Sequence, residues 1–348
     1  MLTKEVLSQR FSTFAENECK GSSELYEFLA LEIAQDDDLL ELCTNTLNGQ
    51  PVPNLLFGAV HYLLLRGNEH TLKDFYPSIV AESKPLKDSF VYFKEFCLIN
   101  KNEIIQLLKT KLVQTNEVRR CAYLYPVFSF IYEKTKKPLA LIEIGTSAGL
   151  QLLWDQYSYS YNSNEIVGNK GSKLHISSEL KGDITPFLTT TSPPVSSRTG
   201  IDLNTVDLTD EGEFLWLKSL IWPEHKERLL MFEKAASYLK DFPVRLVEGD
   251  GVTLLREFVD NVSMDCTVCI FHTHVANQMP LETRNLLLST VESIGKSRDV
   301  FHIYNNIQDK NLHLDYYVVG IEHKQPIAET EGHGKWFKWL SQNDLQAK

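Results

Sequence analysis

Residues 139–150, Leu-Ala-Leu-Ile-Glu-Ile-Gly-Thr-Ser-Ala-Gly-Leu, carry the clearest structural signal in the chain. The run LALIEI does not alternate between apolar and polar residues, which is typical of a strand buried on both faces. Small residues follow in GTSAG, and we expect a turn there and a helix directly after it. Such a turn lets the backbone approach a ligand, and a helix N-terminus offers free N–H groups. The geometry of a tight turn alone would also explain the glycines.

Further short apolar runs follow this strand, at residues 198–203, 244–247, 267–271, 300–304 and 316–321. Helical patterns separate several of them, as in residues 229–239 and 281–294. This alternation predicts an α/β fold with a mostly parallel sheet covered on both faces. The polar residues 157–197 are expected to loop out as an insertion. Residues 312–340 are expected to form an antiparallel hairpin that closes the sheet edge, with residues 323–335 between its two strands.

Residues 1–120 differ from the rest because their apolar positions recur every three or four residues between turn-forming breaks. They predict an all-helical cap region, followed by a second domain over residues 121–348. The longest apolar run, residues 54–65, predicts a buried helix. It is too short to cross a membrane, which takes about 20 residues.

The composition is that of an ordinary globular protein, and we expect its partner to be a small molecule. Its 46 acidic and 35 basic side chains give a formal net charge of -11, which argues against nucleic acid as a partner. Cys266 and Cys269 lie three apart in a strand-like run, so their side chains should point to opposite faces and not pair. With no signal-like N-terminus, we expect a reduced protein of the cytoplasm, not bound to a membrane.

Acidic residues lie at the ends of three of the predicted strands: Glu143 and Asp202 are the next-to-last residues of their runs, and Asp250 lies three residues beyond the run at 244–247. In a doubly wound sheet, ligands bind outside the carboxyl ends of the strands. Carboxylates there would accept hydrogen bonds from ribose hydroxyls and from the amino group of a base. Taken singly, each acid is more often a helix N-cap, and Asp250 before the next helical pattern is a plain candidate.

His272 and His274 follow the run at 267–271 and are the candidate catalytic residues. A histidine there would accept a proton from a substrate hydroxyl or amine. Two other interpretations stay open. The pair would bind a metal if a third ligand joined it, although the sequence shows no such partner and we predict no metal site. Either histidine would otherwise be a hydrogen-bonded core residue.

The chain resembles two families on these residues. In outline, EIGTSAGL resembles the first motif of class I S-adenosylmethionine-dependent methyltransferases, which implies a Rossmann-like sheet. More closely, the chain resembles the uncharacterised bacterial DUF2332 proteins. The matching segments are LIEIGTSAGLQLLWDQYSY, RTGIDLNTVDL, WLKSLIWPEHKERLLMFEKA, LVEGDG and HGKWFKWL.

The methyltransferase resemblance implies a binding site for S-adenosylmethionine. Its methionine and ribose portions would lie against four residues of the first motif: Glu143, Gly145, Ser147 and Gly149. Asp202 would bind the ribose hydroxyls, and Asp250 the adenine amino group. The spacing departs from the family pattern, because Asp202 lies 53 residues beyond Gly149 where about 20 is usual.

Three hypotheses follow. The first is a methyltransferase that acts on an unidentified small molecule, with the helical region selecting the substrate. The second is a non-catalytic binding or regulatory protein on the same scaffold, since a fold does not fix a function. The third is a metal-assisted hydrolase that uses His272 and His274.

Overall fold

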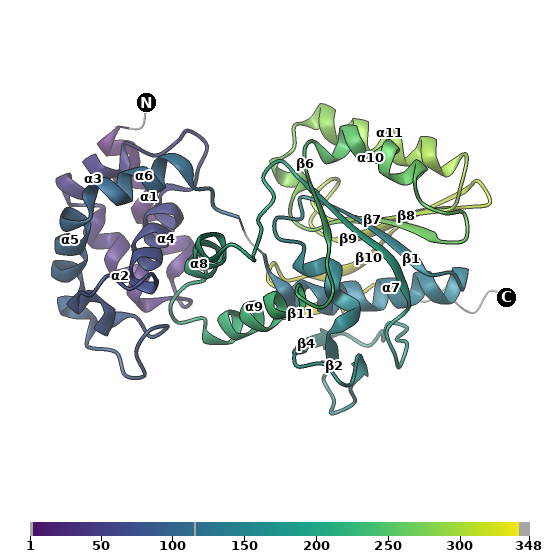
Figure 1. Ribbon diagram of the computed structural model, residues 1–348, viewed down its shortest axis with the longest axis horizontal. Helices are drawn as coiled ribbons and strands as arrows, with labels where there is room; N and C mark the ends of the chain where they lie inside the picture. The colour runs from purple at the N-terminus through teal and green to yellow at the C-terminus, as the bar shows by residue number, and fades with distance from the viewer. Residues whose placement is uncertain (1–2, 115, 341–348) are drawn as a thin grey trace. The chain divides into compact units, whose positions relative to one another are not determined.

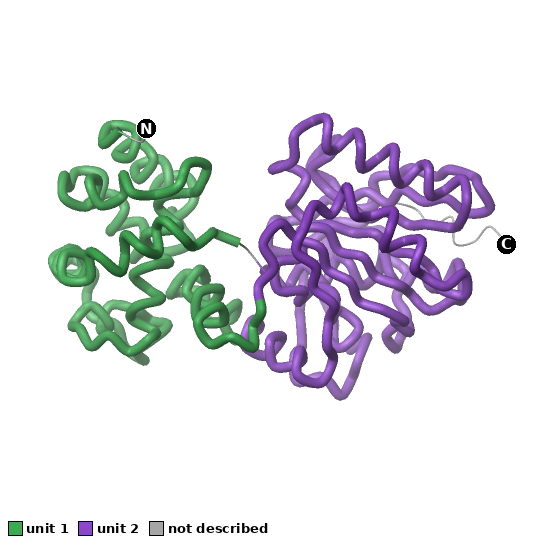
Figure 2. The backbone as a smooth tube through the Cα atoms, turned by 45° about the horizontal axis from the view of Figure 1, so that its top comes forward, with its two compact units in different colours: residues 1–115, 207–230 green, residues 116–206, 231–348 purple. Residues whose placement is uncertain are grey.

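The computed structural model describes residues 3–114 and 116–340. The chain divides into two compact units (Figure 2), residues 1–115 with 207–230 and residues 116–206 with 231–348. We call them the helical unit and the sheet unit. The predicted boundary near residue 120 did not anticipate that residues 207–230 return to the helical unit. In the described residues, no helix is both long and apolar enough to span a bilayer.

The helical unit packs around α4 (Val52–Leu65), whose residues are mostly buried, as the apolar run predicted. Phe57 of α4 stacks on Tyr26 with ring centroids 4.1 Å apart. His61, also on α4, lies between the Ser219 carbonyl at 2.9 Å and the Ser78 hydroxyl at 2.8 Å. The other helical elements of this unit are α1 (Lys4–Phe14), η1 (Ala15–Cys19), α2 (Glu24–Ile33), α3 (Asp37–Cys43), η2 (Thr71–Phe75), η3 (Leu86–Asp88), α5 (Ser89–Ile99), α6 (Lys101–Thr110) and α8 (Glu211–Ser219), while α9 (Lys226–Tyr238) crosses the unit boundary.

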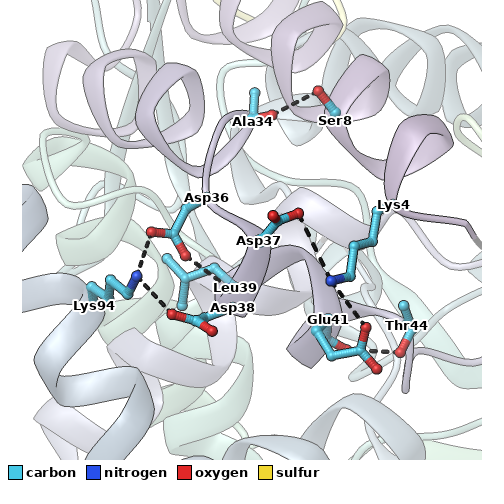
Figure 3. Close-up of polar contacts among 10 residues, drawn as sticks. All are labelled: Lys4, Ser8, Ala34, Asp36, Asp37, Asp38, Leu39, Glu41, Thr44 and Lys94. Atoms are coloured by element: carbon cyan, nitrogen blue, oxygen red, sulfur yellow. Dashed lines mark hydrogen bonds and ion pairs between the residues drawn. The ribbon is translucent and has the colours of Figure 1, made fainter.

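Ion pairs and a helix cap join α1, α3 and α5 (Figure 3). Asp36 caps α3, since its Oδ1 accepts the Leu39 N–H at 3.0 Å. Lys94 of α5 contacts Asp36 at 2.7 Å and Asp38 at 2.8 Å. Because Asp36 is mostly shielded from solvent, it combines two stabilising interactions in one side chain.

The sheet unit is α/β, with a mixed sheet whose central strands are parallel (Figure 1). In the described residues, eleven strands follow the order β3-β2-β4-β11-β10-β9-β8-β7-β1-β5-β6. The strands are β1 (Leu139–Ile144), β2 (Ser158–Tyr161), β3 (Val167–Gly168), β4 (His175–Lys181), β5 (Val195–Asp202), β6 (Arg245–Glu248), β7 (Thr267–His272), β8 (Val300–Tyr304), β9 (Leu312–Val318), β10 (Ile321–Thr330) and β11 (Trp336–Trp339). Strands β6, β5, β1, β7 and β8 are mutually parallel, and the order of connection reverses between β1 and β7.

Helices cover both faces of the central strands, as predicted. On one face, α10 (Gly251–Asp260) and α11 (Leu281–Gly295) pack on Ile142, Ile144 and Ile270. On the other face, Phe128 of α7 (Cys121–Thr135) packs edge-on against Phe271 at 5.5 Å between ring centroids. Short 3-10 helices complete the unit: η4 (Val118–Arg120), η5 (Leu150–Gln156) and η6 (Ala276–Gln278).

Two predictions about the sheet were incomplete. The insertion at 157–197 does not simply loop out, because it supplies β2, β3 and β4 at one end of the sheet. The predicted connection at residues 323–335 was wrong, because β10 covers most of it. Strands β9 and β10 form an antiparallel hairpin around a two-residue turn in which Val319 and Gly320 both have positive φ, as type I′ turns require. It lies inside the sheet and does not close its edge, since β11 and the three insertion strands continue beyond it.

Candidate functional site

The loop after β1 has a left-handed backbone at three positions. The φ angles are 72° at Gly145, 50° at Ser147 and 75° at Gly149, and only the serine pays a steric cost there. The helix expected directly after this turn is present as the short 3-10 helix η5. Residues 150–155 are all buried, leaving no polar face of the kind an amphipathic α-helix presents to water.

The two glycines of this loop make room for protein side chains. A Cβ at Gly145 would lie 2.3 Å from Cγ2 of Val275, in the segment after β7. A Cβ at Gly149 would lie 3.1 Å from Val244 and 3.2 Å from Leu246, next to and within β6. Packing and positive φ together account for both residues, which is the tight-turn explanation the sequence left open.

Glu143 is buried at the carboxyl end of β1, with 3% of its surface exposed. The Thr146 hydroxyl lies 2.6 Å from its Oε2. Burial is the largest influence on this carboxyl and raises its pKa to about 8, with the Asp202 charge adding to the effect. Glu143 is therefore mostly protonated at neutral pH, and it presents a neutral carboxyl group to the site.

Asp202 ends β5 and holds the loop after β1 in place. Its Oδ2 accepts the Ser147 N–H at 2.7 Å, and its Oδ1 accepts the Asn204 N–H at 2.9 Å. A carboxylate has about four acceptor positions, so each oxygen keeps one for a ligand. The Ser147 hydroxyl beside it is buried and makes no hydrogen bond to the described residues. Here the structure brings together two of the residues that the sequence singled out.

Asp250 caps α10, as the alternative interpretation proposed. Its Oδ1 accepts the N–H groups of Val252 at 2.9 Å and Thr253 at 3.4 Å. Its Oδ2 accepts the Thr253 hydroxyl at 3.1 Å. The side chain is exposed, so one acceptor position on Oδ2 still faces outward.

Arg120 is a site residue that the sequence analysis missed. It immediately precedes α7 and is 7% exposed. Its Nε donates to the Gly332 carbonyl at 2.9 Å, and its Nη1 lies 3.3 Å from the Thr273 hydroxyl. The side-chain amide of Gln151, in η5, donates a hydrogen bond to the same Thr273 hydroxyl at 3.1 Å. One feature of the sequence could have indicated this position: charged residues stand directly before a mostly apolar segment. The structure buries that segment, in α7, from Cys121 to Ile131.

The two candidate histidines lie in different environments. His272 is the last residue of β7 and fully buried, with its Nε2 3.2 Å from Nε2 of His302. His274 follows with φ 60°, and it lies beside the Arg120 cluster, since Arg120 is among the charges that lower its pKa. His272 therefore matches the core alternative, and His274 is the histidine near the carboxyl ends of the strands.

Burial keeps both imidazoles neutral. It lowers the pKa of His272 to about 3 and, together with the Arg120 charge, that of His274 to about 4. The Nδ1 of His274 lies 3.4 Å from the Asn306 amide nitrogen, which donates to it in the neutral ring. His274 is accordingly a weak base in this structure.

Metal binding by the two histidines lacks a third ligand. Among residues 3–114 and 116–340, no group of three or more His, Cys, Asp or Glu side chains is arranged to hold a metal ion. Cys266 and Cys269 are both free thiols. The predicted strand holds only Cys269, because Cys266 directly precedes β7.

Comparison with known proteins identifies a family and leaves the reaction open. Neither the curated proteins nor the solved structures contain a match to this chain. A bacterial family described as an uncharacterised protein conserved in bacteria matches residues 8–339, nearly the whole chain. The chain belongs to this family, DUF2332.

Proposed function

We propose that the sheet unit binds S-adenosylmethionine at the carboxyl ends of β1 and β5 and transfers its methyl group to a small molecule. One observation carries the proposal: the parallel order β6-β5-β1-β7-β8 reverses between β1 and β7, and the loop after β1, next to this reversal, is bonded to Asp202 at the end of β5. Ligands of doubly wound sheets bind at such a reversal.

The residues present fit this cofactor. The buried Ser147 hydroxyl has no partner among the described residues, and a ligand polar atom would satisfy it. Asp202 keeps acceptor positions for two ribose hydroxyls, and Asp250 keeps one for the adenine amino group. Gly145 contributes through its backbone, since Val275 fills the space beside its Cα.

The cofactor supplies an activated methyl group on a sulfonium, so the protein's task is mainly to align the reactants. Asp202 fixes the loop through Ser147 and so sets the position of the donor. Glu143, neutral at pH 7, does not attract the sulfonium as a carboxylate would, and it offers a hydroxyl as a hydrogen-bond donor. Burial of Glu143 and Thr146 keeps water from the end of β1.

A non-catalytic role on the same scaffold is the second candidate, and one observation favours it. A methyl acceptor that must lose a proton needs a base whose pKa is near neutrality. His274 has a pKa of about 4 and His272 is enclosed in the core. Such a protein would bind the cofactor without turnover.

Calorimetric titration with S-adenosylmethionine tests the proposal on the full chain. Ser147→Ala removes the unpartnered hydroxyl and leaves the loop backbone unchanged, so we expect roughly tenfold weaker binding, about 1.4 kcal/mol. Asp202→Asn should weaken binding further, because an amide has one acceptor oxygen in place of two. Ser177→Ala, an exposed serine on β4, is the matched control and should bind as the wild type does.

The result that overturns the proposal is wild-type protein, folded by circular dichroism, that gives neither heat nor a thermal shift with S-adenosylmethionine. If the Ser147→Ala and Asp202→Asn variants bind S-adenosylmethionine as strongly as the wild type does, the cofactor does not bind at this loop.

A further inference from the structure

Arg120 is 7% exposed, and its guanidinium makes fewer hydrogen bonds to the protein than its five N–H groups can donate. Its one short hydrogen bond is Nε to the Gly332 carbonyl at 2.9 Å, and the contacts of Nη1 with Thr273 are 3.3 Å to the hydroxyl and 3.5 Å to the carbonyl. Within residues 3–114 and 116–340, Nη2 has no hydrogen bond and no carboxylate forms an ion pair with Arg120. A buried charge without a counter-ion is costly, so proteins seldom keep one.

The neighbouring acids do not neutralise Arg120. Glu143 is close enough for the two groups to influence each other, but burial raises its pKa to about 8 and leaves it uncharged at pH 7. Glu331, one residue before the Gly332 carbonyl, is charged, but one of its carboxylate oxygens accepts the N–H groups of His333 and Lys335, both at 3.0 Å. No described carboxylate therefore pairs directly with the Arg120 guanidinium beside Thr273.

The connection order of the sheet reverses between β1 and β7, and Arg120 contacts the β7 side of this reversal, whereas the proposed cofactor contacts lie on the β1 side. Ser147, Asp202 and Asp250 belong to the ends of β1, β5 and β6. Arg120 instead bonds to Thr273, after β7, and to Gly332, between β10 and β11. This half of the site is where an acceptor would lie if the cofactor occupies the other half.

We infer that Arg120 binds the carboxylate of the methyl acceptor, so that the product is a methyl ester. This inference rests on the proposed function. A guanidinium matches a carboxylate in charge and in the spacing of its paired N–H donors. Because the acceptor arrives already ionised, the reaction needs no base, in agreement with the absence of a basic histidine at the site.

The step balances without a further reagent. A lone pair of a carboxylate oxygen forms the new O–C bond with the methyl carbon, while the S–C bond breaks and its electron pair stays on sulfur. The anionic acid and the cationic sulfonium become a neutral ester and a neutral thioether. No proton is transferred.

Acetate is the probe for the carboxylate site, and acetamide is its uncharged control of nearly the same shape. Both are titrated into full-length protein labelled with ¹⁵N-arginine, at constant ionic strength, and the Nε–H signals are followed by NMR. We expect acetate to shift the Arg120 signal saturably and acetamide to leave it unchanged. Arg198, whose Nε donates to Leu152 at 3.1 Å and whose Nη2 pairs with Asp155, is the internal control.

Arg120→Gln should abolish the saturable acetate response while calorimetry still detects S-adenosylmethionine. If Arg120→Gln instead weakens cofactor binding tenfold or more, Arg120 holds the cofactor's own carboxylate and the inference is overturned. An Arg120 signal that acetate does not shift in the wild-type protein also overturns the inference. This measurement does not depend on whether the Arg120→Gln variant folds. Acetate binding without any cofactor heat would end the methyltransferase proposal and with it the ester, leaving only a carboxylate site.

A chemical signature separates the ester from other products. Wild-type protein is incubated with tritium-labelled S-adenosylmethionine and a bacterial extract filtered to small molecules. Methyl esters release volatile labelled methanol in alkali, whereas methyl ethers and methylamines do not. We expect base-labile label that the Arg120→Gln variant fails to produce; label that withstands alkali overturns the inference.

Discussion

The side chain of Thr146 occupies the space that Gly200 leaves open on the neighbouring strand. A Cβ at Gly200 would lie 2.5 Å from both Oγ1 and Cγ2 of Thr146. The same Thr146 hydroxyl lies 2.6 Å from Glu143. A glycine on β5 thus positions a contact at the end of β1.

Gly200→Ala should therefore displace Thr146 from Glu143 and lower the free energy of unfolding by about 1–3 kcal/mol, the usual cost of overpacking. Urea denaturation measures the loss. Gly171→Ala is the control, because a Cβ there would meet Asn169 Oδ1 at an ordinary contact distance of 3.5 Å and the backbone φ is not in the left-handed region. Adding Thr146→Ala to Gly200→Ala should cost less than the sum of the two single changes, and strict additivity would contradict the assigned contact.

Glu143→Gln should stabilise the protein in alkali. Because the folded-state pKa is raised from 4.5 to about 8, the native state binds more protons than the unfolded state between these values, and stability falls as pH rises through this window. The accumulated cost reaches about 5 kcal/mol above pH 8. Denaturation at pH 6 and pH 9 should show this fall in the wild type and its absence in the variant. An equal fall in both would place the ionisation elsewhere.

Acid should destabilise the protein through its buried histidines. Burial lowers the folded-state pKa of His61 and His274 to about 4 and of His272 to about 3, so the unfolded state binds more protons once the pH drops below about 6.5. At pH 5 each site should cost about 2 kcal/mol.

Denaturant midpoints at pH 7 and pH 5 measure this acid effect. His272→Phe removes one of the groups and should reduce the difference between the two pH values. A wild-type midpoint that does not change between pH 7 and pH 5 would contradict the buried neutral histidines.

The Asp36 cap gives a test within the helical unit. Asp36→Ala removes both the cap of α3 and the ion pair with Lys94, and should lower the free energy of unfolding by about 1–2 kcal/mol. Asp36→Asn keeps the cap and should lose less than half as much. Asp38→Ala breaks a more exposed pair with the same lysine and should change the midpoint little. Equal losses for Ala and Asn at position 36 would assign the stability to the ion pair.

The sequence predicted the parts of the fold that local patterns determine. The strand at 139–144 and the turn after it were found because burial on both faces and small residues leave a local signature. Long-range pairing leaves none. The return of residues 207–230 to the helical unit depends on contacts such as the Trp216 indole N–H donating to Leu112 at 2.9 Å, which no local pattern reveals.

For the candidate site too, the sequence indicated what depends on local patterns and missed what depends on long-range contacts. Asp202 was identified by its place at a strand end, but its bond to Ser147 spans 55 residues and becomes visible only in three dimensions. Arg120 was missed because a charged residue before a helix is ordinarily exposed, and only the fold shows that it is enclosed beside Thr273 and Gly332.

Strand β11 joins the insertion strands to the rest of the sheet. It pairs in antiparallel fashion with β10 and in parallel with β4, where Trp336 lies opposite Glu179. During synthesis, β4 leaves the ribosome more than 150 residues before β11 does. Until β11 is made, the backbone N–H and C=O groups on that edge of β4 have no strand to pair with. Such an edge invites pairing with other chains, so we expect nascent chains stalled before residue 336 to depend on a chaperone and to aggregate without one.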